Sequence, residues 1–191
     1  MSRNLIIGLF ACLVLLQIAV PVSMIVQRES ILKTGTQFRF KTAPVDPYDA
    51  FRGRFVALRV AGGDNIPRPE GLDLKYGQKV YAQIGLDDKG FAKVSQITLQ
   101  KPQGSAYMTA TVNVFSPLTK EVVLHLPIDR YYMEESAAPR AERVYREHSR
   151  RGVRQDAYVD VRVKDGEAVI EELYIGGERI EDVLKQAKEK K

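Results

Sequence analysis

The stretch Gln78–Gln100, QKVYAQIGLDDKGFAKVSQITLQ, contains two runs of alternating apolar and polar residues with a polar turn between them. Alternation with a period of two places every second side chain on the same face, which is typical of a strand with one buried face. The turn Asp87–Gly90 (DDKG) supplies residues that favour a tight reversal of the chain. We therefore predict an antiparallel hairpin of Gln78–Leu86 and Phe91–Gln100.

The same alternation recurs along the rest of the chain, at the short spacing that indicates a mainly β domain. One of these runs, Arg54–Val60, is predicted as a single strand with Phe55 and either Leu58 or Val60 facing inward, and with Ala57 as a further inward candidate. A second hairpin is expected around the turn Lys164–Glu167. In addition to Arg54–Val60, the predicted strands are Thr36–Thr42, Tyr107–Phe115, Glu121–Leu126, Asp156–Val163 and Ala168–Ile175.

A helical pattern interrupts the strands at Pro139–Arg151, where Ala141, Val144, Tyr145 and His148 recur at helical spacing. The final stretch, Ile180–Lys191, is predicted to form a short helix. The predicted fold class is therefore mainly β (α+β). We expect antiparallel sheets or a distorted barrel, one packed amphipathic helix and an N-terminal transmembrane helix.

The N-terminal stretch Leu5–Val26 (LIIGLFACLVLLQIAVPVSMIV) is 22 residues long and carries no charge. A helix needs about 20 apolar residues to cross the hydrocarbon core of a membrane. We predict an uncleaved signal anchor. A cleaved signal peptide would have a shorter apolar region and a small-residue cleavage site. A lipoprotein signal ending at Cys12 would have too short an apolar run before the cysteine.

The predicted organisation is a short cytoplasmic N-terminus (residues 1–4), a transmembrane segment (5–26) and a single extracytoplasmic β-rich domain (27–191). The flanking cations Arg3, Arg28 and Lys33 do not decide the orientation by themselves. The short leader and the large following domain favour an N-inside topology at the cell membrane.

The charge and the cysteine and histidine content argue against several classes of function. The formal net charge of +5, from 29 basic and 24 acidic residues, is typical of an ordinary mixed surface. Because Cys12 is the single cysteine, no intramolecular disulfide or cysteine metal cluster is possible. The histidines, His125 and His148, share no ligand spacing, so we expect neither a metal nor a cofactor. Nucleic acid is a poor fit for a domain outside the cytoplasm without an array of stacking aromatics.

The stretch Val45–Val60, VDPYDAFRGRFVALRV, resembles the signature of the GDYXXLXY family of membrane proteins. In that family, an acidic DP-x-D-x-F-R-G segment leads into GDYxxLxY. The chain departs from the pattern at Arg54, where the family has Asp, at Phe55 and at Val60, where it has Tyr. The resemblance implies a membrane anchor and a membrane partner, namely a multi-pass membrane protein, but no established reaction.

Two similar corners follow alternating strands, Pro44–Tyr48 (PVDPY) and Pro127–Tyr131 (PIDRY). Around the first corner, arginines could hold a carboxylate or phosphate in a two-pronged grip, or simply brace the turn against an aspartate. Around the second, paired carboxylates could act in acid–base chemistry, or merely favour the positive end of the following helix. The candidate residues are Asp46, Asp49, Arg52 and Arg54 at the first corner, and Asp129, Arg130, Tyr131 and Glu134 at the second.

Arginines are concentrated on the predicted helix and just after it, at Arg140, Arg143, Arg146, Arg150 and Arg151. A basic helix can lie on anionic lipid headgroups or bind an acidic partner, and it can also be a solvated face.

The sequence favours a non-enzymatic role: a membrane-tethered envelope domain that contacts lipid through Leu5–Val26 and binds a membrane protein or another envelope component. The alternative is a small-ligand binder or hydrolase-type enzyme that uses the Asp46/Arg52 and Asp129/Tyr131 corners. For this alternative, the four side chains must converge in one concave pocket.

Overall fold

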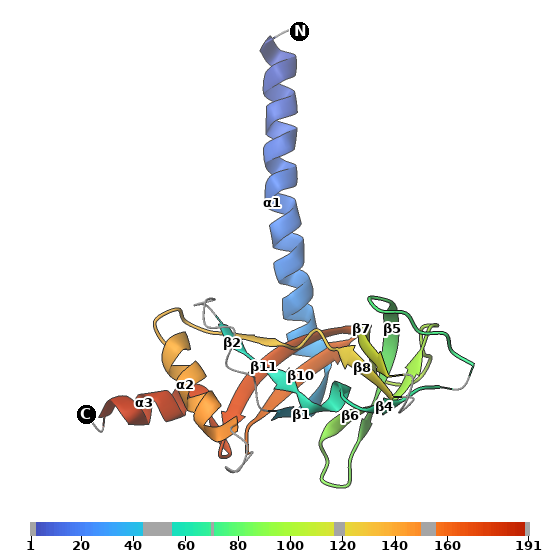
Figure 1. Cartoon of the computed structure of the whole chain (residues 1–191). Coiled ribbons are helices and arrows are strands. Elements are labelled where there is room, and N and C mark those ends of the chain that lie inside the picture. Colours follow the sequence, from blue (N-terminus) through green and yellow to red (C-terminus); the bar gives the residue numbers. More distant parts are fainter. Residues whose placement is uncertain (1–2, 44–54, 70, 117–120, 150–155, 190–191) are drawn as a thin grey trace.

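The computed structural model describes residues 3–43, 55–69, 71–116, 121–149 and 156–189. Within these residues, two five-stranded antiparallel sheets pack against each other, and a long N-terminal helix rises from one side of them (Figure 1). The fold is mainly β with packed helices, as predicted. The first sheet has the order β12 (Glu178–Arg179), β11 (Glu167–Ile175), β10 (Tyr158–Lys164), β1 (Thr36–Ala43) and β3 (Arg59–Val60).

The second sheet is built around the predicted hairpin. Its order is β4 (Ile66–Pro67), β8 (Glu121–His125), β7 (Tyr107–Ser116), β5 (Lys79–Leu86) and β6 (Ala92–Thr98). The turn between β5 and β6 forms because the Asp87 carboxylate accepts hydrogen bonds from the backbone amides of Lys89 (2.9 Å) and Phe91 (2.8 Å). This Asx-type turn explains why alternation and turn residues together predicted the hairpin correctly.

The other predicted hairpin is also present, as β10 and β11. Asp165 (φ 51°) and Gly166 (φ 87°) both adopt the left-handed backbone that a two-residue hairpin turn requires. The amide of Thr109 in β7 donates a 2.8 Å hydrogen bond to the carbonyl of Gly166, which joins the two sheets at this tip. Between the sheets lie fully buried apolar side chains, among them Phe40, Met108 and Leu173.

The prediction of one strand over Arg54–Val60 was wrong. The chain divides at Leu58 into β2 (Phe55–Ala57), which pairs with β9 (Arg130–Tyr132) in a two-stranded ribbon, and β3, which pairs with β1. The Leu58 amide donates to the Asp129 carbonyl (2.8 Å), and this contact marks where the chain crosses from one sheet to the other. Phe55 is only half-buried, whereas its neighbour Val56 is fully buried, so the prediction that Phe55 faces inward was wrong. Leu58, one of the two inward alternatives further along the run, is buried.

Two further helices pack on the sheets: α2 (Ala138–Ser149), between β9 and β10, and α3 (Ile180–Glu189), after β12. A short 3-10 turn, η1 (Ala61–Gly63), lies between β3 and β4. Ala141 and Tyr145 of α2 are fully buried, which confirms the predicted amphipathic helix. Ile180 and Leu184 of α3 are buried as well. The C-terminal helix is therefore a second packed helix, and the prediction of a single packed helix was incomplete.

Candidate functional site

The N-terminal helix α1 (Arg3–Thr34) continues through Val26 without a break. It is long and apolar enough to cross a membrane by length and composition, and the apolar stretch is not covered by the rest of the chain. Leu15 and Ile25, for example, are about two-thirds exposed. Such a helix is consistent with a single-pass membrane anchor. The boundary predicted after residue 26 falls inside this helix, and residues 27–34 form its base.

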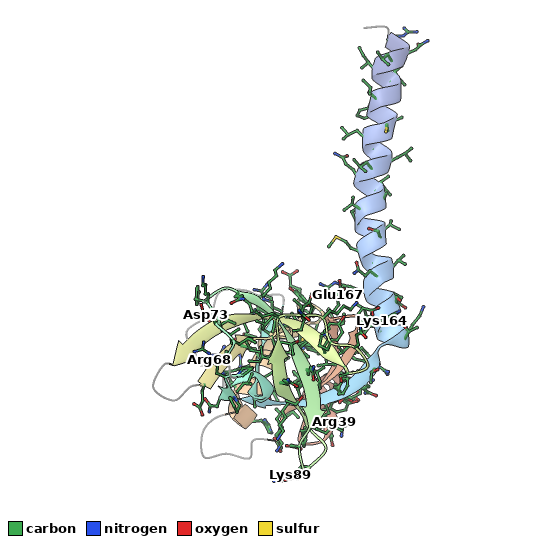
Figure 2. All side chains as sticks on the ribbon, turned by 90° about the vertical axis from the view of Figure 1, so that its right-hand side faces the viewer. Arg39, Arg68, Asp73, Lys89, Lys164 and Glu167 are labelled. Carbon is green, nitrogen blue, oxygen red and sulfur yellow. The ribbon has the colours of Figure 1, made fainter. Side chains whose placement is uncertain are left out.

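The base of α1 is fastened to the tip of the β10–β11 hairpin. The Gln27 amide donates to the Glu167 carboxylate at 2.6 Å. Lys164 donates to the hydroxyls of Ser30 (3.1 Å) and Thr34 (2.7 Å). Figure 2 shows Lys164 and Glu167 beside the lower end of the helix. These polar contacts hold the helix against the sheet at three positions along about two turns.

An apolar contact and a backbone contact complete this attachment. Ile31 is 4% exposed and is the buried residue of α1. Arg162 of β10 donates to the carbonyl of Gly35, directly after the helix, at 3.3 Å. Because β1 starts at Thr36, only Gly35 separates the helix from the first sheet. The helix is therefore joined almost without a linker to the two packed sheets, which we call the sandwich.

A groove of about 530 Å³ lies between the base of α1 and the sandwich, and we call it the junction groove. The helix contributes Met24, Arg28 and Ile31, and the sandwich contributes Thr109, Pro127, Glu167 and Val169, among others. Because Met24 is near the end of the apolar stretch Leu5–Val26, the groove places the surface of the sandwich next to the end of that stretch. The groove combines apolar walls with one cation and one carboxylate.

Tyr131, a predicted site residue, is buried. Its hydroxyl donates a 2.8 Å hydrogen bond to Oε1 of Glu172 in β11, and Arg179 pairs with the other oxygen of that carboxylate. Burial of the ring, followed by the hydrogen bond to Glu172, raises the pKa of Tyr131 well above its usual range. A phenol held in its neutral form in this way braces the ribbon on β11 and is poorly suited to acid–base work at neutral pH.

Asp129 lies in different surroundings from Tyr131. Its carboxylate is 3.9 Å from Nε2 of His125 and 3.7 Å from Nε of Arg130, and its side chain is partly exposed. Asp129 and His125 line a groove of about 450 Å³ beside β3 and β8, together with Arg59 and Asp64. Tyr131 is not among the residues that line this groove. Asp129 and Tyr131, which were predicted to share one site, are therefore separated: Asp129 lines a surface groove and Tyr131 lies in the protein interior.

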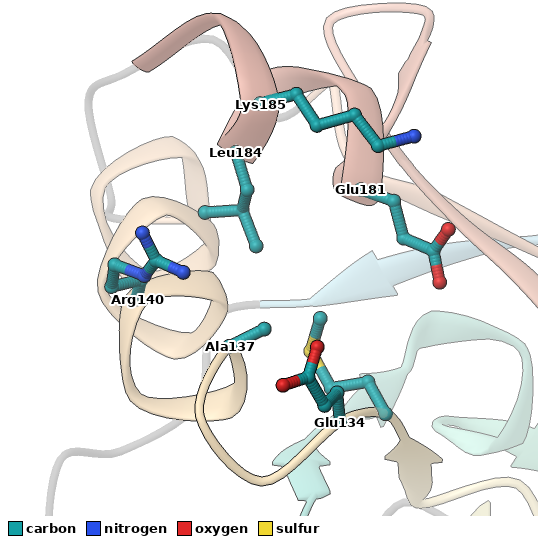
Figure 3. A pocket seen from close by; sticks show the side chains of 7 residues that line it. Glu134, Ala137, Arg140, Glu181, Leu184 and Lys185 are labelled. Atoms are coloured by element: carbon teal, nitrogen blue, oxygen red, sulfur yellow. The ribbon is translucent and has the colours of Figure 1, made fainter. Parts of the chain in front are cut away.

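Glu134 and Arg140 line the same pocket, as Figure 3 shows. This pocket of about 230 Å³ lies between α2 and α3, and we call it the α2–α3 pocket. Glu181 and Lys185 of α3 lie on its other side, and the apolar lining residues are Met133, Ala137 and Leu184. The sequence prediction missed Glu181 and Lys185, since their helix was not expected to pack against α2. Their spacing around Leu184, with one buried position per turn, was the available signal.

The arginines of α2 do not form one uniform basic face. Arg140 lines the pocket, Arg143 is exposed, and Arg146 pairs with Glu142 at 2.6 Å. Among the residues that the structure describes, no group of three His, Cys, Asp or Glu side chains is placed to hold a metal ion. The other predicted site residues, Asp46, Asp49, Arg52, Arg54, Arg150 and Arg151, lie outside the described residues.

The profile of the GDYXXLXY protein family matches residues 17–173 of the chain. The chain belongs to this family. The resemblance seen in Val45–Val60 is confirmed, and the match to the GDYXXLXY family starts inside α1 and ends in β11, so it includes the junction groove. Within the signature, Leu58 is the buried residue at which the strand divides. Neither a curated protein nor a solved structure shows a significant match to the chain.

Proposed function

We propose that this GDYXXLXY protein is a single-pass membrane protein with its sandwich on the extracytoplasmic side, and that the sandwich binds a membrane-embedded partner at the junction groove. The observation that carries this proposal is the continuity of α1 from the apolar stretch into its fastened base. Because Gly35 alone separates α1 from β1, the groove stays next to the membrane surface.

The chemistry of the junction groove suits the end of a transmembrane helix as it leaves the bilayer. Met24 and Val169 offer apolar contact to the last lipid-embedded turn of such a helix. Arg28 and Glu167 offer charged partners to the polar residues that follow. A protein that binds in this way acts as an accessory subunit and needs no reaction of its own.

Photo-crosslinking in cell membranes tests this proposal. A benzophenone amino acid at Val169, in the groove, is compared with the same amino acid at Lys89, in the β5–β6 turn. Figure 2 shows Lys89 on the side of the domain remote from α1. We expect an adduct with an integral membrane protein from position 169 and none from position 89. Reversing the groove charge with Arg28→Glu should reduce the yield severalfold.

Failure of the proposal has two distinguishable forms. A chain recovered in the soluble fraction would refute membrane anchoring itself. A chain that stays with the membranes but gives no adduct from position 169 would refute only the partner groove. The orientation is tested separately by adding protease outside intact spheroplasts, which should digest the sandwich and leave the short N-terminus protected.

The α2–α3 pocket supports a second candidate function, the binding of a small zwitterion. Each side of the pocket carries one acid and one base, Glu134 with Arg140 beside α2 and Glu181 with Lys185 on α3, around an apolar lining. Carboxylates and cations around an apolar surface are the groups that would orient an amino-acid-like ligand. A panel of amino acids should then raise the thermal unfolding midpoint of the natural chain, and Arg140→Ala should abolish the rise. Arg143→Ala, at an exposed position on the same helix, is the matched control.

A further inference from the structure

The β2–β9 ribbon has one buried face and one outward face. Val56 is fully buried and Tyr131 is 7% exposed, and the two residues are directly paired across the ribbon. Because side chains alternate along a strand, the paired residues Phe55 and Tyr132 face away from the interior. Their ring centroids are 5.8 Å apart, and Tyr132 is 64% exposed.

Arg130 lies on the same outward face. Its guanidinium carbon is 5.1 Å from the centroid of the Phe55 ring. Phe55, Arg130 and Tyr132 thus form a small surface of two rings and one cation, which we call the aromatic face. Neighbouring rings on an outward face, unlike a single exposed side chain, are a candidate site of contact with a membrane or a partner.

The location of the ribbon suggests what covers the aromatic face. Figure 1 shows β2 and the segment that leads from β8 through β9 on the side of the domain from which α1 leaves. Pro127, in that segment, lines the junction groove with Met24 and Arg28 of the helix. The same side of the molecule therefore extends from the base of the apolar helix to the ribbon.

We infer that the aromatic face lies in the headgroup region of the phospholipid bilayer and forms a second membrane contact beside α1. This inference rests on the membrane anchoring proposed above. Tyrosine and other amphipathic rings favour this region because the ring is apolar and the hydroxyl remains hydrated. Since Gln27–Glu167 and Lys164–Thr34 fix the helix to the sandwich, the height of the ribbon relative to the lipid is fixed as well.

The charge on the aromatic face points to the rings, and not to anionic lipid, as the source of binding. The Asp129 carboxylate lies 3.7 Å from Arg130 and offsets its charge. The contact should accordingly form on neutral phosphatidylcholine and should change little when anionic lipid is added.

The absence of tryptophan from the chain provides a direct test. The full chain with Tyr132→Trp is reconstituted into phosphatidylcholine vesicles, in which the new residue is the only tryptophan. Lipids with a nitroxide on the headgroup should quench its fluorescence severalfold more strongly than that of Lys89→Trp, which reports on the side remote from α1. Leu16→Trp, in the apolar helix, should be quenched by nitroxides placed deep in the acyl chains.

The three variants separate the two proposals. Quenching at position 16 without quenching at position 132 would overturn the second contact and leave the anchor standing. No quenching at position 16 would overturn the anchor. Circular dichroism checks that each variant is folded, and Phe55→Trp replaces Tyr132→Trp if that variant fails to fold. Strong headgroup quenching at 132 or 55, but not at 89, supports the inference.

Discussion

The hydroxyl of Tyr131 donates a hydrogen bond of 2.8 Å to Oε1 of Glu172, a residue 41 positions further along the chain. This contact ties the β2–β9 ribbon to β11. Arg179 pairs with the second oxygen of the same carboxylate. Glu172 is 5% exposed, so these donors satisfy a carboxylate that would otherwise be costly to bury. The ribbon, and with it the aromatic face, depends on this network for its position.

Replacing Tyr131 by phenylalanine should lower the free energy of unfolding by about 1–3 kcal/mol, because a buried acceptor loses its donor. Urea unfolding of the chain in a fixed detergent measures the change. Tyr132→Phe is the matched control, since it removes the same hydroxyl from an exposed neighbour and should cost less than about 0.5 kcal/mol. Equal losses in the two variants would show that the Tyr131–Glu172 bond has no special weight.

Stability at alkaline pH should depend on the same tyrosine. Burial raises the pKa of Tyr131 above its ordinary value of 10.0. A group whose pKa is raised by folding contributes stability that is complete below the unfolded pKa and is lost as the pH rises toward the folded one. The free energy of unfolding should therefore fall as the pH rises above 10.0. Urea titrations across this range should show a smaller fall for Tyr131→Phe than for the natural chain, and identical slopes would contradict the assignment.

Gly35 should not tolerate a side chain. A Cβ at this position would lie 2.5 Å from the carbonyl oxygen of Ile31 and 3.2 Å from the backbone N and O of Val163. Since these are backbone atoms, the base of α1 and β10 would have to separate. We expect Gly35→Ala to cost about 1–3 kcal/mol of stability and to accelerate amide hydrogen exchange at the start of β1. Gly8→Ala is the control, because a Cβ there meets nothing within 4 Å.

The β5–β6 turn should weaken in acid. Backbone hydrogen bonds from Phe91 and Lys89 lower the pKa of Asp87 below its ordinary value of 3.8. A lowered pKa means that the stabilisation is present above the unfolded pKa and is lost as the pH falls through the folded one. Carbon NMR of the carboxyl group should show a titration midpoint below 3.8. Asp87→Asn should reduce the acid sensitivity of the hairpin, and Asp88→Asn should leave it unchanged.

The hairpins, the apolar helix and the amphipathic helix were predictable because each is a local pattern. The strand periods of β5 and β6 and the turn at Asp87 lie within one short segment, and the apolar stretch Leu5–Val26 needs no partner to be recognised. The candidate site was predictable only in part. Glu134 and Arg140 were predicted and share a pocket, but Glu181 and Lys185, which complete it, come from a helix whose packing the local pattern did not reveal.

The sequence by itself determined which segments form strands and which form helices. Both follow from the spacing of apolar side chains within one short segment. Only the tertiary structure decided what each face meets. It divided Arg54–Val60 at Leu58, placed Tyr131 against Glu172 and turned Phe55 outward, because each of these outcomes depends on contacts between segments far apart in the chain. Periodicity defines two faces of a strand, and only long-range packing selects the one that is buried.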